Sequence, residues 1–329
     1  MTEKASMFDT KDYVVVAIWT LVGLITMRNR RWWLVTVSLL NLVAAIVGFF
    51  FPKHDLETQG NLPVDDIHIQ LNRVICILMF SQLFFVFCVR NTRDDCVVNN
   101  LLSTQVLVSA MIINISIMTF MRPNTFLKPF SLSSMLYGNI VLGLTATYHL
   151  IRNGNFGGKE EKSIRLHFHL RLDAIIIYMS AFNLLAFTTP RLANSFGVKP
   201  DDQHIYLAQI AAAFKIGLAF ITQRAPGFAS VDDKKSVVFF RIFMNVALVA
   251  NWAYFQVVLQ GGKVSSLIRL VSIIGLLTIN LLLAVCPASL SFSPMFWRKC
   301  EEAPAHTYQL RSSTTTTTSR VTRSSKKNT

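Results

Sequence analysis

The chain has few charged residues and no polar stretch long enough to form a soluble domain. Only 15% of its 329 residues are charged, whereas an ordinary soluble domain carries about 25%. Hydrophobic residues make up 52% of the chain, and the mean hydropathy is +0.43. Apolar stretches of 18 to 25 residues recur along it, and the core of a soluble protein does not need that length. The sequence therefore predicts an all-α integral membrane protein with many spans.

The sequence also lacks the motifs of the common membrane enzymes. It contains no G-x-S-x-G serine, no H-E-x-x-H pair and no phosphate-binding P-loop. All 18 carboxylates fall in predicted loops or at predicted helix ends, and Asp173 is the deepest of them. Proton and sodium pathways usually place an acidic residue inside the membrane. We therefore expect no catalytic residue, no cofactor and no metal, and the pattern argues against ion-coupled transport.

Eight segments have the length and apolar character of membrane-spanning helices. A ninth apolar stretch, Tyr13–Met27, is short, and the sequence leaves open whether it crosses the membrane or lies half buried in it. Because arginines follow this stretch, it does not resemble a cleaved signal peptide. The eight predicted spans are Trp32–Pro52, Ile67–Val89, Val97–Met121, Phe130–Ile151, Leu172–Pro190, Ile205–Thr222, Ser236–Gln260 and Ser266–Pro287.

The net charge of +14 comes from basic residues that flank the apolar spans. Connections on one side of the predicted membrane carry twenty lysines and arginines, against six on the other side. The positive-inside rule places the first side, with the C-terminus, in the cytosol. Because this rule accounts for the positive net charge, the basic residues do not indicate nucleic-acid binding, and we do not expect nucleic acid as a partner. The five cysteines lie in spans or on the cytosolic side, so no disulfide framework is expected.

A repeat is visible near an offset of 136 residues. Asp65–Leu71 and Asp201–Leu207 are identical at five of seven positions. Asparagines, a Val-Val pair and a proline recur in the same order at similar offsets. The predicted organisation is two parallel four-helix repeats: residues 1–31 form an N-terminal segment, 32–151 the first repeat, 152–171 a cytosolic linker, 172–287 the second repeat and 288–329 a basic Ser/Thr-rich tail.

The repeated Asp-Asp-x-His motif opens two spans on the non-cytosolic side. His68 and His204 form a candidate pair on this outer face, where acids and imidazoles can bind a cation or sense pH. The simpler interpretation is that Asp65 or Asp66, and Asp201 or Asp202, cap the helix N-termini. The sequence favours capping.

Basic side chains also enter the predicted spans. Arg73, Arg241 and Arg269 lie close enough to helix ends to reach the headgroups. Lys215 lies deeper, on a helix face with Ala208, Ala211, Ala212 and Ala219, and small residues mark a contact between helices. Its ammonium group could balance an anionic ligand, or it could donate to amides and backbone carbonyls.

Amide side chains lie near the middle of six spans. They could line a polar cavity between the repeats near the midplane, or they could hold helices together through hydrogen bonds. With Lys215, these candidate substrate-binding residues are Asn41, Gln105, Asn139, Asn183, Asn245 and Asn280.

The tail has the composition of a disordered segment. Its last residues, Lys326-Lys327-Asn328-Thr329, resemble a dilysine signal for retrieval to the endoplasmic reticulum. We expect a protein that binds or moves a small solute or lipid at the interface of its repeats. The alternative is a non-catalytic membrane scaffold or accessory subunit. The expected partners are the lipid bilayer, a small solute or lipid, and a membrane-protein partner or a second copy of the chain.

Overall fold

A computed structural model describes residues 10–122, 126–153, 164–258 and 264–285, and nearly all of these residues are helical. The described residues contain no strand, only one isolated bridge between Gly60 and Leu127. The helices are α1 Thr10–Met27, α2 Arg30–Phe50, α3 Pro52–Gln59, α4 Asp66–Cys88, α5 Asp95–Phe120, α6 Pro129–Asn153, α7 Ile164–Ala186, α8 Thr188–Phe196, α9 Asp202–Arg224, the 3-10 turn η1 Ala225–Gly227, α10 Val231–Val258 and α11 Val264–Val285. The predicted tail, with its dilysine sequence, lies outside the described residues.

Seven of the described helices are long and apolar enough to cross a membrane, namely α2, α4, α5, α7, α9, α10 and α11. Each of them overlaps one of the eight predicted spans. The eighth predicted span, Phe130–Ile151, lies within α6, which has 25 residues but is not among these seven helices. The apolar stretch Tyr13–Met27 forms a shorter helix.

The predicted span Leu172–Pro190 is misplaced along the chain. Helix α7 begins at Ile164 and ends at Ala186, and Pro190 belongs to the separate helix α8. Basic and histidine residues lower the hydropathy of the first two turns of α7, so hydropathy alone does not locate the beginning of this helix. The predicted linker 152–171 is correspondingly shorter, because α7 takes its last eight residues.

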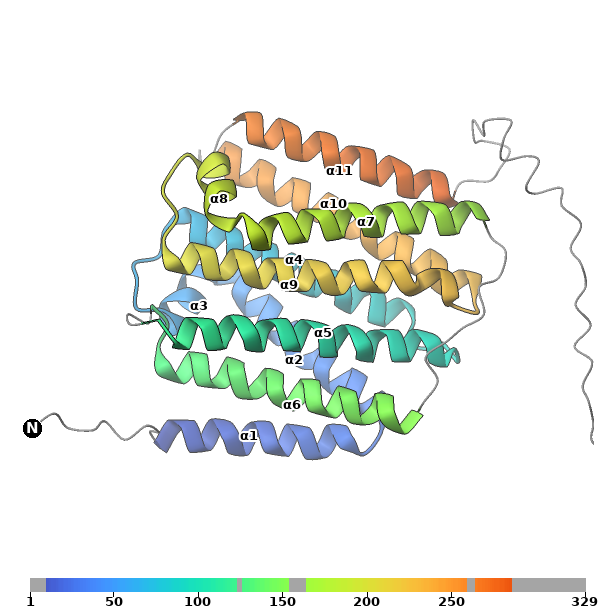
Figure 1. Cartoon of the computed structure of the whole chain (residues 1–329), viewed down its shortest axis with the longest axis horizontal. Coiled ribbons are helices and arrows are strands. Elements are labelled where there is room, and N and C mark those ends of the chain that lie inside the picture. The colour runs from blue at the N-terminus through green and yellow to red at the C-terminus, as the bar shows by residue number, and fades with distance from the viewer. Residues whose placement is uncertain (1–9, 123–125, 154–163, 259–263, 286–329) are drawn as a thin grey trace, which may run out of the picture. The chain divides into compact units, whose positions relative to one another are not determined.

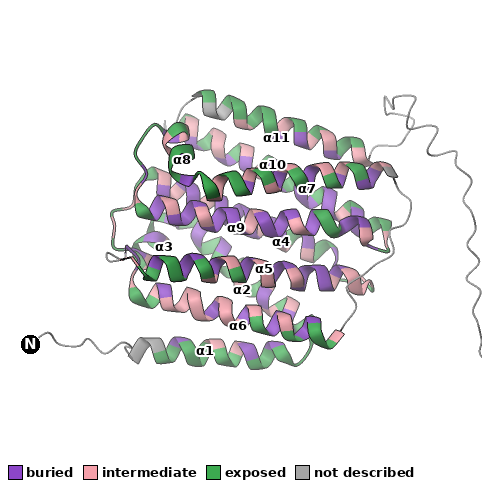
Figure 2. Ribbon diagram, in the orientation of Figure 1, coloured by how far each residue is buried: buried purple, intermediate pink, exposed green. Residues whose placement is uncertain are grey.

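Helices α4 and α9 form the centre of the bundle. They contact each other, and α4 also packs against α2 and α10 while α9 packs against α5 and α7. Of the residues in their apolar windows, 72% in α9 and 56% in α4 are buried, against 17% in α11. Helix α1 packs on α6 and α11 on α10, which places them at opposite edges of the bundle (Figure 1). Figure 2 shows the same contrast between the buried centre and the exposed edges.

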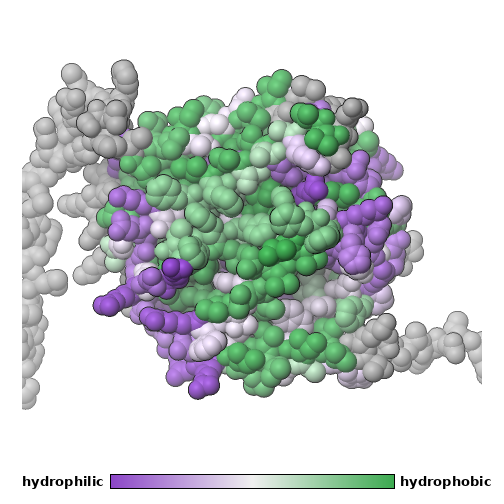
Figure 3. Space-filling model, turned by 180° about the vertical axis from the view of Figure 1, so that it is seen from behind, coloured by the Kyte–Doolittle hydropathy of each residue, from purple (hydrophilic) through white to green (hydrophobic). Residues whose placement is uncertain are grey.

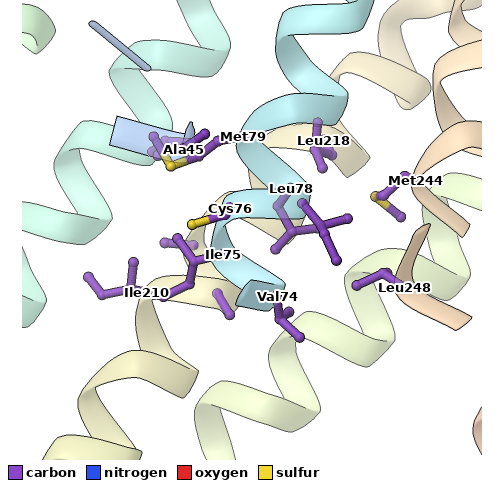
Figure 4. Close-up of a cluster of buried hydrophobic side chains, with 14 of the residues drawn as sticks. Ala45, Val74, Ile75, Cys76, Leu78, Met79, Ile210, Leu218, Met244 and Leu248 are labelled. Atoms are coloured by element: carbon purple, nitrogen blue, oxygen red, sulfur yellow. The ribbon is translucent and has the colours of Figure 1, made fainter. Parts of the chain in front are cut away.

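The core between the central helices is filled by aliphatic and sulfur-containing side chains. Leu78 of α4 lies on the side of Leu218 of α9 and Met244 of α10, whereas Cys76 lies on the opposite side of α4, against Gly48 of α2 (Figure 4). The side chains of Leu78, Leu218, Met244 and Cys76 are all buried. On the outside, the surface is apolar over the middle of the helices and polar towards their two ends (Figure 3). Large apolar side chains on a surface are favourable in contact with lipid, whereas in contact with water they would be unfavourable.

The short helices α3 and α8 lie at the same end of the bundle, where α4 and α9 begin (Figure 1). Each follows a phenylalanine with nearly the same backbone angles, φ −122° and ψ 48° at Phe51 and φ −122° and ψ 38° at Phe187. These residues are 136 positions apart, as are the first residues of α4 and α9, Asp66 and Asp202. Because α4 and α9 both have 23 residues, they also end 136 positions apart.

Candidate functional site

A cleft lies between α2, α4 and α5. Its cavity volume is about 10 Å³, which is room for about one water-sized group. Its walls are mainly apolar, and polar groups are contributed by all three helices. The lining residues are Trp33, Leu34, Val37, Ser38, Asn41, Gln82, Leu83, Val86, Leu101 and Gln105. Apolar walls with a few polar groups are typical of small-molecule sites.

Three carboxamides line the cleft, and two of them have no protein partner. Gln105 donates from Nε2 to Ser109 Oγ at 3.0 Å. Asn41 and Gln82 make no hydrogen bond with any residue that the structure describes. Gln82 is only 9% exposed, and no charged side chain lines the cleft. Because neither amide is bonded to the described residues, both are available to a bound molecule with an uncharged donor or acceptor.

The other predicted amides lie elsewhere and serve local contacts. Asn139 Nδ2 donates to Met135 O of its own helix at 2.8 Å. Asn183 Oδ1 accepts from Arg191 Nη1 at 2.8 Å. Asn245 Nδ2 donates to Thr278 Oγ1 of α11 at 3.3 Å. The structure therefore brings only Asn41 and Gln105 of the predicted set into one cavity.

Asn280, the sixth predicted amide, joins α11 to α7. Its Oδ1 lies 2.6 Å from His169 Nδ1, and its Nδ2 donates to the carbonyl oxygen of the same histidine at 3.2 Å. This double contact is an interhelical hydrogen-bond pair of the kind that stabilises helix packing in membranes.

A buried ion pair joins α7 to α10, and it corrects two expectations. Arg241 donates from Nε to Asp173 Oδ2 at 2.8 Å and from Nη2 to Asp173 Oδ1 at 3.3 Å, and both side chains are almost completely buried. Arg241 therefore does not extend to the headgroups. Asp173 is the tenth residue of α7, well inside a helix rather than near its end. A carboxylate therefore does lie within the bundle. The argument against ion-coupled transport, which rested on the expected absence of such a carboxylate, no longer holds.

Lys215 is the fourteenth of the 23 residues of α9 and is partly exposed. The four alanines that share its face, Ala208, Ala211, Ala212 and Ala219, are almost completely buried. Among the described residues, Lys215 makes no hydrogen bond or ion pair. The charges that act on it most are the guanidinium groups of Arg191 and Arg241, and both are cationic.

His68 and His204 stack on each other where α4 and α9 begin. Their ring centroids are 3.8 Å apart with an interplanar angle of 4°. Asp65 and Asp201 are the N-caps of the two helices, which confirms capping by the first acid of each motif. His68 Nε2 lies 3.2 Å from Asp201 Oδ1, and His204 Nε2 lies 3.0 Å from Asp65 Oδ1. Each helix start is therefore tied to the carboxylate that caps the other.

These contacts shift the ionisation of Asp65. Partial burial raises the pKa of this carboxyl, but hydrogen bonds from the His68 backbone and the His204 side chain, together with both imidazoles, lower it more. The net result is a pKa below the ordinary value of 3.8. The carboxylate form is the one that the helix start stabilises.

Asp65, His68 and His204 have ligand atoms within 4.8 Å of one another, close enough to consider a metal ion. An imidazole binds a metal near its own ring plane. Two parallel rings in a stack cannot both direct a nitrogen at one ion unless a ring rotates. Both nitrogens of each ring are also engaged with Asp65 or Asp201. We therefore do not assign a metal to these residues.

Sequence reasoning missed Gln82 and the partners of the buried charges. Gln82 is a carboxamide inside the apolar span Ile67–Val89, so an inventory of every amide in a span would have found it. The sequence also gives no signal that Asp173 faces Arg241, or that Lys234 Nζ lies 3.3 Å from His167 Nε2.

Comparison with known proteins identifies a family but no activity. Residues 35–286 match a protein family described as a domain of unknown function (DUF8292). The match begins within α2 and extends to the end of α11, and it includes the ion pair, the stacked histidines and the residues of the cleft except Trp33 and Leu34. No curated protein and no solved structure matches the chain.

Proposed function

The chain belongs to the DUF8292 family, and we propose that it is a membrane protein that binds a small solute or lipid in the cleft between α2, α4 and α5. The observation that carries this proposal is the pair of carboxamides, Asn41 and Gln82, that face the cleft and make no hydrogen bond with the residues that the structure describes. The ligand is inferred to carry an uncharged polar group, such as a hydroxyl or a carbonyl, on an otherwise apolar body.

The surroundings of the cleft support this ligand class. In hydrocarbon, an amide cannot exchange a lost protein partner for bulk water. A hydroxyl or carbonyl between Asn41 and Gln82 would satisfy both groups, and Gln105 offers a third carboxamide nearby. A charged ligand would find no counter-ion among the lining residues.

We also propose that the chain consists of two repeats, α2 to α6 and α7 to α11. The constant offset of 136 residues between the starts of α4 and α9 and between Phe51 and Phe187 supports this organisation. The cleft is lined by α2, α4 and α5, which all belong to the first of these repeats. The ligand site accordingly lies within the first repeat rather than between the repeats.

The charge distribution supports an orientation with the C-terminus in the cytosol, and the dilysine sequence supports residence in the endoplasmic reticulum. The alternative function, a non-catalytic scaffold or accessory subunit, is favoured by the amides that serve helix packing. Asn245 and Asn280 each bond to a neighbouring helix. If Asn41 and Gln82 also contribute only to packing, this alternative replaces the ligand-binding proposal.

The test is whether the purified protein retains a ligand that depends on the two free carboxamides. Wild type, the Asn41→Leu/Gln82→Leu variant and Asn139→Leu would be purified in mild detergent, extracted with organic solvent and analysed by mass spectrometry. Asn139→Leu is the matched control, because it removes a carboxamide that bonds within its own helix.

Wild type and Asn139→Leu should retain a hydroxyl- or carbonyl-bearing compound at about one molecule per chain, and the cleft variant should lose it. Circular dichroism would check that all three proteins keep the same helix content. Equal retention by all three proteins, or no retained compound in wild type, would contradict the proposal.

A further inference from the structure

We infer a second binding site, separate from the cleft, in which Arg73 of α4 binds a phosphate group beside the aromatic rings of Phe49 and Tyr254. Arg73 precedes Gln82 by nine residues on α4, which is about 13 Å along the helix axis. It does not line the cleft. The ligand inferred for the cleft is uncharged, so this site adds a second class of ligand.

Two rings from neighbouring helices contact the guanidinium group of Arg73. Its Cζ atom lies over the ring of Phe49 in α2, 5.9 Å from the ring centroid, and over the ring of Tyr254 in α10, 5.2 Å from the centroid. Both distances are within the range of a cation–π contact. A ring face attracts the positive charge but offers no oxygen or nitrogen acceptor. The N–H donors of Arg73 are therefore left for another group.

No acidic side chain in the described part of the chain compensates the charge of Arg73. Arg73 forms no ion pair or hydrogen bond with those residues, and its Nε atom is buried without a partner among them. Asp55 of α3 lies at the same end of the bundle, but its carboxylate accepts from Asn72 Nδ2 and Gln59 Nε2. A cation and a buried donor without partners are both unfavourable. An anion bound to Arg73 would remove both penalties.

A buried carboxamide next to Arg73 supplies a further polar group. Gln70 lies three residues earlier on α4, and residues at this spacing are neighbours on one helix face, with Cβ atoms about 5–6 Å apart. Its side chain is completely buried, yet neither Nε2 nor Oε1 has a hydrogen-bond partner among the residues that the structure describes. A phosphate carries three acceptor oxygens, so it can accept from Arg73 and from Gln70 Nε2 together.

The position of Arg73 suits a phosphate at the polar edge of the membrane. Phe49 is the next-to-last residue of α2, Tyr254 lies four residues before the end of α10, and Arg73 is the eighth residue of α4. Arg73 is partly exposed and Tyr254 is exposed, so the group is accessible from outside the protein. Arginine and tyrosine side chains are typical of the level where hydrocarbon meets the headgroups.

The test measures thermal unfolding of the purified protein in dodecyl maltoside, a detergent without charge or phosphate. In one series, the micelles receive increasing phosphatidic acid. In the other, inorganic phosphate replaces chloride at constant ionic strength. The variants are Arg73→Gln, Arg73→Lys and Tyr254→Leu, and the control is Arg90→Gln. Arg90 is a matched control, because its guanidinium group also lies over a ring, 4.2 Å from the centroid of Phe87, but it is exposed just beyond the other end of α4.

Phosphatidic acid should raise the unfolding temperature of wild type and of Arg90→Gln. Arg73→Gln should need at least about tenfold more lipid for the same shift, since it loses a charge-assisted contact. Arg73→Lys keeps the charge without the paired donors, so it should lie between the two. Tyr254→Leu removes one ring and should need about two- to fivefold more lipid. A shift with inorganic phosphate as well would identify a soluble phosphate as ligand, and a shift with the lipid alone would identify a headgroup.

The inference is overturned if neither source of phosphate stabilises wild type, or if Arg73→Gln responds as wild type or as Arg90→Gln does. If Arg73→Gln does not fold, an unchanged response of both Arg73→Lys and Tyr254→Leu overturns it. The Asn41→Leu/Gln82→Leu variant should keep the full response to phosphatidic acid. Loss of the cleft ligand and loss of the phosphate effect are therefore distinguishable.

Discussion

His68 and His204 lie face to face, 3.8 Å apart, and each ring accepts a hydrogen bond from the backbone of its own N-cap. Because Nδ1 is the acceptor in both rings, the hydrogen of the neutral imidazole is on Nε2. That nitrogen faces the N-cap carboxylate of the other helix, Asp201 for His68 and Asp65 for His204. The two central helices therefore begin at one shared hydrogen-bond network.

The first prediction is that this network weakens in mild acid. A protonated imidazole must donate from both nitrogens, so it would lose the bond to the N-cap N–H. Two charged rings in a stack would also repel each other. We expect the unfolding temperature of wild type to be lower at pH 5.5 than at pH 7.5, because protonation of either imidazole breaks these contacts.

The His68→Gln/His204→Gln variant should show a smaller fall between pH 7.5 and 5.5, measured by thermal denaturation in detergent. His54→Gln is the control, because His54 is an exposed residue of α3 at the same end of the bundle. The same pH dependence in all three proteins would refute the interpretation.

The second prediction concerns Asp65 at lower pH. Since the folded protein lowers the pKa of Asp65 below 3.8, its carboxylate contributes stability that is fully present above that ordinary value. The contribution is lost as the pH falls through the lowered pKa. Asp65→Asn keeps a good N-cap but removes the stability that the carboxylate contributes. The free energy of unfolding of this variant should therefore depend less on pH below about 5. Asp66→Asn, which removes a neighbouring charge without a hydrogen bond in the described structure, should keep the slope of wild type.

The third prediction tests the ion pair of α7 and α10. Arg241→Met or Asp173→Leu alone leaves a buried charge without a partner, and each should lower the free energy of unfolding by about 3–5 kcal/mol. The double variant removes both charges and should recover most of that loss, as measured by denaturant unfolding. If the two single effects simply add in the double variant, the pair does not act as a unit.

The fourth prediction uses two glycines in similar helices. A Cβ atom at Gly217 of α9 would overlap Val108 of α5 and would lie 3.1 Å from Thr104 Cγ2, whereas a Cβ at Gly275 of α11 meets no atom within 4 Å. Gly217→Ala should therefore destabilise the protein by about 1–3 kcal/mol, because a close helix contact is forced apart. Gly275→Ala should be neutral or slightly stabilising, since alanine favours helix. Thermal denaturation of the two variants would compare them directly.

The helical class and the helix starts at Asp65 and Asp201 could be predicted, because span length and N-cap chemistry are local properties of the sequence. The contacts between helices could not. In helices that are apolar on nearly every face, no periodicity shows which side meets which neighbour. The stacking of His68 on His204 follows from the contact between α4 and α9, and only the folded chain shows it.

Only part of the candidate site could be predicted, because the site also depends on contacts between helices. Asn41 and Gln105 were found because amides are rare in apolar spans. Their separation from Asn139, Asn183, Asn245 and Asn280 depends on helix packing. Selection of amides by repeat-related pairs also excluded Gln82, whose chemistry alone would have placed it in the set.

The measurement that tests the central claim most directly is the reactivity of a thiol placed in the cleft. Ser38→Cys lines the cleft, and Ser81→Cys lies in α4 beside Gln82 but is completely buried. Both changes would be made in a chain without its five native cysteines. N-ethylmaleimide reacts with the thiolate, which forms where water or another polar group reaches the sulfur.

If the cleft is an open polar site, Ser38→Cys will react much faster than Ser81→Cys in native membranes, and more slowly when the retained ligand is added back to delipidated protein. If Ser38→Cys reacts as slowly as Ser81→Cys, the cleft is a closed packing defect and the ligand-binding account is contradicted.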